Sequence, residues 1–412
     1  MDKNGKIFLV ILFIFSLLLK LFYGYLYENK FHPDKYDFSP HEEMAINFMQ
    51  GNGLVYEYKI NDNLSIKRYY EDELLYPLIC GIVYFITKHN VLIMLLTQMF
   101  YVSFIPIFIY FISRQILGIK TARLAAILAS LAPGIIVYSA GKIHSMTFYS
   151  LVFCVLLWAA LRFIKSQNTA NVLLLGGMLG IGILGRNTII YFVPALFLYL
   201  FIRKKINIAG MTKVTLVIIA VLLPLIIRNY RFYNKVVILR DGGWTPVLEG
   251  TLDDYNGKPL LDGVHKEIFA SYKQLTNAEY IKILESKVRE IIRENKAKFI
   301  ISVCKRFYYF WWFSPHTGME YPSLYLRLYK PYYLLFLLFA IAGISVLFLK
   351  NFRRDSSGQR DWLLLFIFII LITIPHYLLY AEGRHRFAIE PILAIFTSYG
   401  ILYIYNNLTK KR

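Results

Sequence analysis

Carboxylates gather early in the sequence, and they are the first side chains that could do chemistry. They are Asp34, Asp37, Glu42, Glu43, Glu71, Asp72 and Glu73. A carboxylate acts as a general base when it reaches the proton of an acceptor hydroxyl. Most acids in a polar segment are solvated surface charges, and we expect that of six of these seven. Spacing alone does not single out the seventh.

Arginines form a second group, because several of them stand at the ends of long apolar runs. They are Arg186, Arg228, Arg231, Arg384 and Arg386. An ionisable side chain at membrane depth is costly, so it is a functional hypothesis by default. Any one of these arginines alone could contact a lipid headgroup or a loop carboxylate. Five at one face favour phosphate binding, because the planar guanidinium group binds phosphate through two parallel hydrogen bonds.

The histidines and cysteines give no pattern of metal ligands. His41, His144 and His385 share no His-x-x-His spacing, and no two cysteines stand two residues apart. The sequence also lacks an Asp-x-Asp motif, which could hold a sugar nucleotide through a divalent cation. We therefore expect no metal and no cofactor at the site.

The elements that must position these residues are membrane helices. The chain has 412 residues, of which 57% are hydrophobic, and a run of about 20 apolar residues spans a bilayer core of about 30 Å. We expect an all-α integral membrane protein, a polytopic bundle of about ten transmembrane helices. The expected spans are 7–26, 91–113, 121–140, 146–164, 171–186, 187–203, 211–228, 331–350, 362–380 and 387–406. The first of them is interpreted as a retained signal anchor.

Charge gives the expected orientation of the bundle. Short loops rich in Lys and Arg stay on the cytoplasmic side of a membrane. The basic pieces that an inside N-terminus puts there are 1–6, 114–120, 165–170, 204–210, 351–361 and 407–412. Both termini are then cytoplasmic, in the plasma membrane of a prokaryote. The net charge of +20 follows from this topology, so no nucleic-acid partner is needed.

Two long outer loops result, and we expect the chemistry where they meet the helix ends. The first loop, 27–90, holds an apolar segment at 74–87 that is too short to span, so we expect an interfacial or re-entrant helix. The second loop, 229–330, mixes charged and aromatic residues over 282–313, which predicts an amphipathic surface helix. The expected division of the chain is 1–228, 229–330 and 331–412.

The order of several short motifs resembles a known group of membrane enzymes. Asp37 stands eight residues before Ala45, and a Gly51-x-Gly53 turn follows. Further matches are Leu75-Tyr76-Pro77, Leu184-Gly185-Arg186, Pro224 with Arg228-Asn-Tyr, and Arg384-x-Arg386. Together they resemble the GT-C superfamily, specifically the protein O-mannosyltransferase and aminoarabinose-transferase relatives of glycosyltransferase family 39. One departure is His144, where the family has an acid.

The resemblance implies a reaction and a role for each candidate residue. A sugar would pass from a polyprenyl-phosphate donor, held among membrane lipids, to an acceptor on the outer face. The acceptor could be a glycan, a glycolipid or a protein. Asp37 would be the catalytic base, and the donor phosphate would meet Arg228, Arg231, Arg384 and Arg386. Candidate substrate contacts are Arg186, Glu42, Glu43, Tyr76 and His144. A glycolipid flippase and a surface-polysaccharide polymerase or ligase stay open as alternatives.

Overall fold

Helices make up most of the structure, as the long apolar runs predict. The computed structural model describes residues 3–27, 40–61, 64–68, 74–233, 236, 244–251, 277–314, 321, 323–353, 361–379 and 381–409. Within these ranges there is one sheet, an antiparallel hairpin of β1 (Tyr56–Asn61) and β2 (Leu64–Arg68). The largely α-helical fold is confirmed, and the hairpin is an addition that the sequence analysis did not predict.

The N-terminal part holds a long helix and two short ones that pack on each other. These are α1 (Lys3–Leu26), α2 (Pro40–Met49) and α3 (Leu75–Thr87). Helix α2 lies close against α3 at Gly81, because a Cβ atom there would stand 2.7 Å from the ring of Phe48. The apolar segment expected at 74–87 is α3, and it ends at Lys88, whose φ of 55° is left-handed.

The next five helices lie between residues 91 and 165. They are α4 (Val91–Val102), α5 (Ile105–Leu117), α6 (Ile119–Ser130), α7 (Pro133–Gly141) and α8 (Ser145–Lys165). Helices α6 and α7 are bent by 42° relative to each other. The bend occurs at Pro133, because proline has no N–H to donate and disfavours a helical conformation at Ala132.

Three helices follow, and two of them pack through small residues. They are α9 (Thr169–Gly185), α10 (Ile189–Ile202) and α11 (Ile208–Tyr233). Gly176 and Gly180 are one helical turn apart, and Cβ atoms at these positions would stand 2.6 and 2.7 Å from Val217 and Val221 of α11. Such small residues let two membrane helices approach closely, so α9 and α11 lie side by side.

The C-terminal part corrects one expectation. The amphipathic segment at 282–313 is two helices, because Asn295 interrupts it and its side-chain oxygen accepts the Lys298 N–H at 2.9 Å to begin a new helix. The elements here are α12 (Trp244–Thr251), α14 (Asn277–Glu294), α15 (Lys296–Trp311), α17 (Ser323–Arg353), α18 (Trp362–Leu378), the 3-10 helix η3 (Gly383–Arg386) and α19 (Glu390–Thr409).

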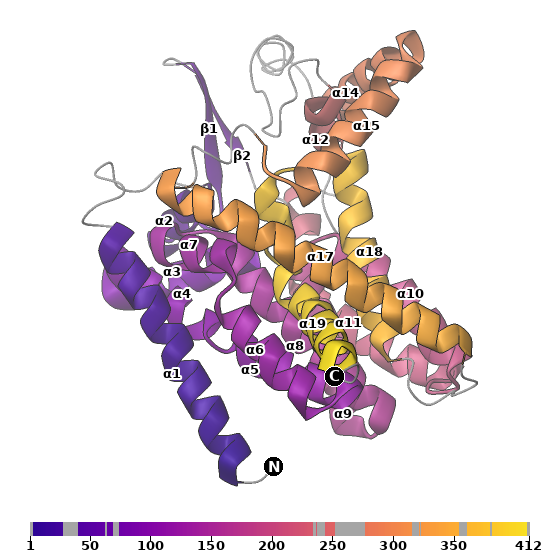
Figure 1. The fold of residues 1–412 in the computed structure, drawn as a ribbon. Helices are drawn as coiled ribbons and strands as arrows, with labels where there is room; N and C mark the ends of the chain where they lie inside the picture. Colours follow the sequence, from indigo (N-terminus) through magenta and orange to yellow (C-terminus); the bar gives the residue numbers. More distant parts are fainter. Residues whose placement is uncertain are drawn as a thin grey trace.

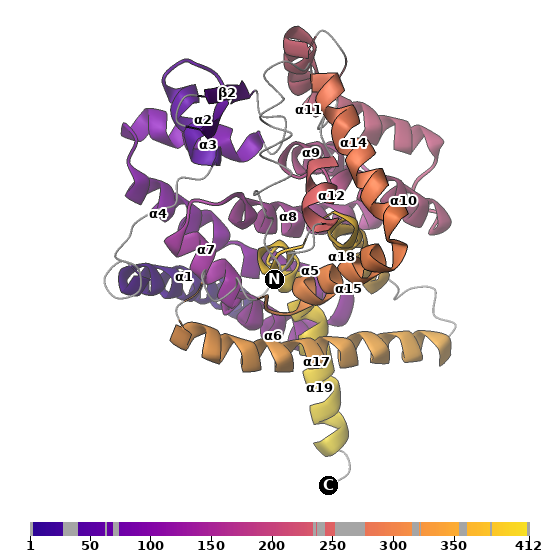
Figure 2. The ribbon, with the colours of Figure 1, turned by 90° about the horizontal axis from the view of Figure 1, so that it is seen from above.

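The arrangement separates two ends of the bundle. Figure 1 shows the hairpin, α14 and α15 at one end, and the N-terminus at the other. Figure 2 shows α17 lying along one side, where it crosses α19. The crossing is close because Gly343 and Gly400 face each other, and a Cβ atom on Gly343 would stand 2.1 Å from the Phe396 carbonyl oxygen.

The number of spans stays a prediction. Within the described residues, five helices are long and apolar enough to cross a membrane, or six if the bent pair α6–α7 is one span. Helices α9, α10 and α18 are apolar but shorter. The proposed division of the chain also stays a prediction, and its boundaries at 228 and 330 fall inside α11 and α17.

The predicted orientation can be checked with single cysteines at exposed positions. In a Cys304→Ser background, which removes the exposed native thiol, Asn52→Cys should react with an impermeant maleimide in intact cells. Ser166→Cys at the end of α8 should react only after permeabilisation, because the basic 165–170 loop is expected inside. Both positions are exposed. Labelling of Ser166→Cys from outside would reverse the topology.

Candidate active site

Arginine and histidine side chains from four helix ends lie close together. His144 directly precedes α8, Arg186 directly follows α9, His376 lies in the last turn of α18, and His385 lies in η3. An Arg384 NH group lies 3.3 Å from the His144 Nε2 atom, and an Arg186 NH group lies 3.1 Å from His376 Nε2. The rings of His376 and His385 stack with centroids 4.3 Å apart. We call these five residues the Arg–His cluster.

Backbone hydrogen bonds fix which nitrogen of two rings carries the proton. The Met146 N–H donates to His144 Nδ1 at 3.1 Å, and the Glu382 N–H donates to His385 Nδ1 at 3.1 Å. A neutral imidazole with an accepting Nδ1 must carry its proton on Nε2. Burial lowers the pKa of His144, and Arg384 lowers it further; burial and His376 lower the pKa of His385. Both rings are therefore neutral near pH 7.

The contact between Arg384 and His144 consequently brings two donors together. Guanidinium has no acceptor atom, and His144 Nε2 carries a proton in this tautomer. Glu382 holds the other side of Arg384, with its carboxylate oxygens 2.6 Å from Nε and 3.0 Å from an NH2 group. An acceptor placed between Arg384 and His144 would take a hydrogen bond from each. The arrangement is suited to an anion.

Helix packing explains why Arg186 reaches this place. Gly185 ends α9 against α8, where a Cβ atom would stand 2.6 Å from the ring of Tyr149. The Arg186 N–H then bonds to the Gly182 carbonyl at 2.7 Å, and the buried side chain turns toward His376. Arg186 and Arg384 therefore approach the same histidine cluster from different helices.

A polar chain through Tyr76 positions His144. The hydroxyl of buried Tyr76 donates to the Gln98 side-chain oxygen, which also accepts the His144 N–H at 3.3 Å. The Gln98 amide nitrogen donates to the Lys142 carbonyl at 2.9 Å. Tyr76, predicted as a substrate contact, thus lies where it supports the segment before α8.

The start of α2 lies beside the same cluster. The ring of His41 lies 6.3 Å from that of His144 and 5.7 Å from that of Tyr76. Glu42 was expected to be solvated, and that expectation is wrong, since its side chain is only 2% exposed. Packing of α2 on α3 brings it to the Tyr84 hydroxyl, which donates to the carboxylate at 2.7 Å. Glu43 is half-buried.

Arg386 lies in a different setting from Arg384. Its buried guanidinium pairs with Glu390 at 3.0 Å, four residues later on the chain. It also donates to the Trp312 carbonyl at 3.2 Å and lies 4.1 Å from the ring centre of Tyr333. The Tyr329 hydroxyl donates to the same carboxylate at 2.8 Å. These contacts hold Arg386 in a buried ion pair, and its predicted role as a phosphate ligand stays a prediction.

The remaining predicted residues lie apart or outside the description. Arg228 donates to the Leu54 carbonyl at 3.2 Å, so it ties α11 to the segment before β1. Arg231 is exposed on α11. Asp37, the predicted base, lies outside the described residues. Among the residues that are described, no group of three or more His, Cys, Asp or Glu side chains is placed to hold a metal ion.

Comparisons with known proteins match this architecture. A family model described as dolichyl-phosphate-mannose-protein mannosyltransferase matches residues 73–228, less than half of the chain. No curated protein sequence matches. The crystal structure of the Archaeoglobus fulgidus oligosaccharyltransferase with zinc and sulfate has a TM-score of 0.60 at 13% identity, over 97% of this chain and 49% of that chain. The chain has a GT-C fold.

Two further solved structures are similar. Archaeal oligosaccharyltransferase AglB from Archaeoglobus fulgidus, in complex with an inhibitory peptide and a dolichol-phosphate, has a TM-score of 0.56 at 11% identity, over 100% of this chain and 52% of that chain. ArnT from Cupriavidus metallidurans, bound to undecaprenyl phosphate, has a TM-score of 0.42 at 12% identity, over 97% of this chain and 78% of that chain. The chain spans about half the length of the oligosaccharyltransferases. The expected GT-C resemblance is confirmed, and the chain is a multi-pass membrane protein.

The family match covers residues 73–228 and therefore includes Tyr76, His144 and Arg186. The sequence analysis missed His376, Glu382 and Gln98. His376 had a usable signal, because it interrupts an apolar run near the end of α18. Gln98 had none, since its partners Lys142 and His144 are far away in the sequence. Glu382 had a weak one, since it stands two residues before Arg384.

The buried pair Arg386–Glu390 should be important for stability. Glu390→Gln leaves an uncompensated guanidinium charge inside the protein, which typically costs about 3–5 kcal/mol. The matched control is Glu285→Gln, which breaks another Arg–Glu pair at the same four-residue spacing on exposed α14. That pair contributes about 0.3–0.5 kcal/mol. Thermal unfolding in detergent should separate the two variants, and equal melting temperatures would contradict the structural role.

Proposed function

We propose that the chain is a membrane glycosyltransferase that moves a sugar from a polyprenyl-phosphate donor to an acceptor hydroxyl on the outer face of the membrane. The observation that carries the proposal is the Arg384–His144 contact, in which two donors face each other, so that an anion between them would accept a hydrogen bond from each. The family match supports it, because that family's description names a dolichyl-phosphate sugar as donor. The acceptor would be a glycan, a glycolipid or a protein.

The Arg–His cluster would bind the donor phosphate. Arg384, His144 Nε2–H and Arg186 present donors to it from different helix ends. As the bond between the anomeric carbon and the phosphate oxygen breaks, negative charge grows on the leaving phosphate. Donors fixed before the reaction stabilise that charge most effectively. This assignment replaces Arg386 by Arg186 and His144 among the phosphate ligands proposed from the sequence.

The acceptor would lose its proton to a carboxylate. Asp37 is the proposed base, on the strength of its match to the family motif. It lies four residues before His41, and four residues of extended chain span at most about 14 Å. His41 lies beside His144, which supports the proposal. The acceptor oxygen would attack the anomeric carbon, its proton would pass to the carboxylate, and polyprenyl phosphate would leave.

Arg384→Lys should lower transfer while the protein still inserts and folds. Lysine keeps the charge but cannot contact both Glu382 oxygens and still present an NH group beside His144. Loss of one donor to a developing oxyanion costs on the order of 100- to 1,000-fold in kcat. The measurement is sugar transfer by purified enzyme with a panel of polyprenyl-phosphate sugars, with exposed Arg293→Lys on α14 as control. A wild-type rate for Arg384→Lys would exclude this residue as a phosphate ligand.

Asp37→Asn should abolish transfer with little change in expression. Asparagine has the same size but cannot take a proton, and loss of a general base costs on the order of 100- to 10,000-fold in rate. The matched control is Asp34→Asn, an identical change three residues earlier in the same segment. Glu42 is buried against Tyr84, so Glu42→Gln could also lower stability. The melting temperature of this variant is therefore measured together with its transfer rate.

Three outcomes of that experiment point elsewhere. An active Asp37→Asn enzyme with an inactive but folded Glu43→Gln variant would move the base to α2. Glycolipid movement between leaflets by protein that never transfers a sugar would favour a flippase. Polymer extension that survives Asp37→Asn would favour a surface-polysaccharide polymerase or ligase.

A further inference from the structure

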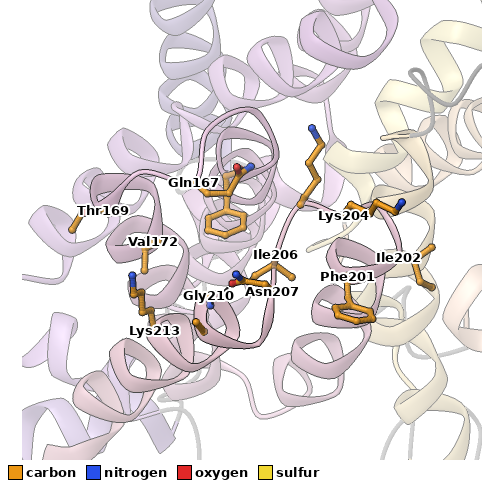
Figure 3. A pocket seen from close by; sticks show the side chains of 13 residues that line it. Gln167, Thr169, Val172, Phe201, Ile202, Lys204, Ile206, Asn207, Gly210 and Lys213 are labelled. Atoms are coloured by element: carbon orange, nitrogen blue, oxygen red, sulfur yellow. Dashed lines mark hydrogen bonds between the residues drawn. The ribbon is translucent and has the colours of Figure 1, made fainter.

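A cavity of about 830 Å³ opens at the other end of α8 and α9 from the candidate active site. It is lined where the chain passes from α8 to α9 and from α10 to α11 (Figure 3). Helix α8 runs from His144 at the Arg–His cluster to Lys165 near the cavity, and its 21 residues measure about 31 Å. The cavity is therefore distinct from the active site and close to one bilayer thickness away.

The cavity is basic. Lys204, Lys205 and Lys213 line it, and Figure 3 shows Lys204 and Lys213 on opposite sides. In the part of the chain that the structure describes, no carboxylate forms an ion pair with any of the three. Neighbouring Arg203 does have such a partner, since it lies 3.4 Å from Asp361. The lysines thus present positive charge to the cavity.

Two helix N-termini add to this positive potential. Helix α9 begins at Thr169 and α11 at Ile208, and Thr169 and Asn207 line the cavity. The start of a helix carries partial positive charge and favours an anion. The opposing carbonyl end of α8 is covered, because the Gln167 side-chain amide donates to the Phe163 carbonyl at 2.8 Å. The electrostatics of the cavity therefore favour a phosphate group.

The cavity edge is apolar as well as basic. Phe201 and Ile202 line it, and Ile202 is 68% exposed. Ile208, next to Asn207 in the chain, is 75% exposed. A small soluble anion gains nothing from such side chains, whereas the acyl chains of a lipid bury them. Basic pockets between membrane helices bind anionic lipid headgroups on the cytoplasmic side, and the charge pattern predicts that side for this end.

We propose that this cavity binds the phosphate headgroup of an anionic phospholipid, with the acyl chains lying against the exposed residues Phe201, Ile202 and Ile208. The three lysines bind the phosphate, and the positive ends of α9 and α11, whose Asn171 and Gly210 N–H groups are capped by Asn168 and Asn207, add to the potential around it. The site takes a lipid from the leaflet opposite the candidate active site, and it does not depend on the proposed glycosyl transfer.

The experiment is native mass spectrometry of the purified full-length chain, titrated with phosphatidylglycerol or phosphatidylcholine. The wild type should retain phosphatidylglycerol preferentially. Lys204→Gln, Lys205→Gln and Lys213→Gln combined should weaken that binding roughly 10- to 100-fold, because each lysine near a membrane surface contributes several-fold to binding of anionic lipid. A matched triple change of Lys3, Lys6 and Lys120 to Gln should leave it unchanged. An equal loss of phosphatidylglycerol binding in both triple variants would show that only the overall positive charge matters, and it would overturn the proposal.

A second variant tests the cavity without changing charge. Ala209→Phe places a ring in the space that the headgroup would fill, so phosphatidylglycerol binding should fall while all three lysines remain. Wild-type binding by Ala209→Phe would overturn the proposal. Glycerol 3-phosphate tests whether the natural ligand is a soluble phosphate compound instead of a lipid. It should not displace the lipid at equal concentration, and displacement would identify a soluble phosphate ligand in place of a lipid.

Discussion

A guanidinium group can only donate hydrogen bonds, and the organisation of the candidate active site follows from that constraint. Arg384 is held on one side by the carboxylate of Glu382, and on the other it meets a ring nitrogen that also carries a proton. That proton is on Nε2 because the Met146 N–H occupies Nδ1 of His144. The first turn of α8 thus makes His144 present a donor beside Arg384, and a pair of donors favours an anionic ligand.

The supporting structure keeps these donors in place before any ligand arrives. Gln98 links α4 to the backbone at Lys142 and His144, and Tyr76 links α3 to Gln98. Gly185 lets α9 end against Tyr149 of α8. None of these residues needs to touch the substrate. They restrict the rotation of the side chains that do, so less ordering is required when the donor binds.

The sequence predicted the helical character well, because hydropathy is a local property and the apolar runs are long. It predicted Arg186, Arg384 and His144 at one face, since helix ends on the same side of a bilayer must meet there. It did not predict the burial of Glu42, which depends on Gly81, a residue far away in the sequence that lets α2 approach α3. The buried pairing of Arg386 with Glu390 was not predicted either, although Glu390 stands only four residues later in the sequence.

The break at Asn295 could also have been found from the sequence, because asparagine is a favoured residue at the start of a helix. The hairpin β1–β2 also had a local signal. Tyr56, Tyr58 and Ile60 alternate with Glu57, Lys59 and Asn61, which is the period of a strand. The pattern is short, and a two-stranded ribbon is marginally stable alone.

The lengths of α9, α10 and α18 have a consequence for the lipid around the protein. They hold 17, 14 and 17 residues, or roughly 21–26 Å of helix, which is shorter than a typical hydrocarbon core. Helix α10 presents Tyr191, Leu198 and Phe201 outward, so lipid meets it directly. A bilayer adapts to a short apolar surface by becoming thinner there. Headgroups of both leaflets are then drawn inward beside α10, toward the Arg–His cluster on one side and the lysine-lined cavity on the other.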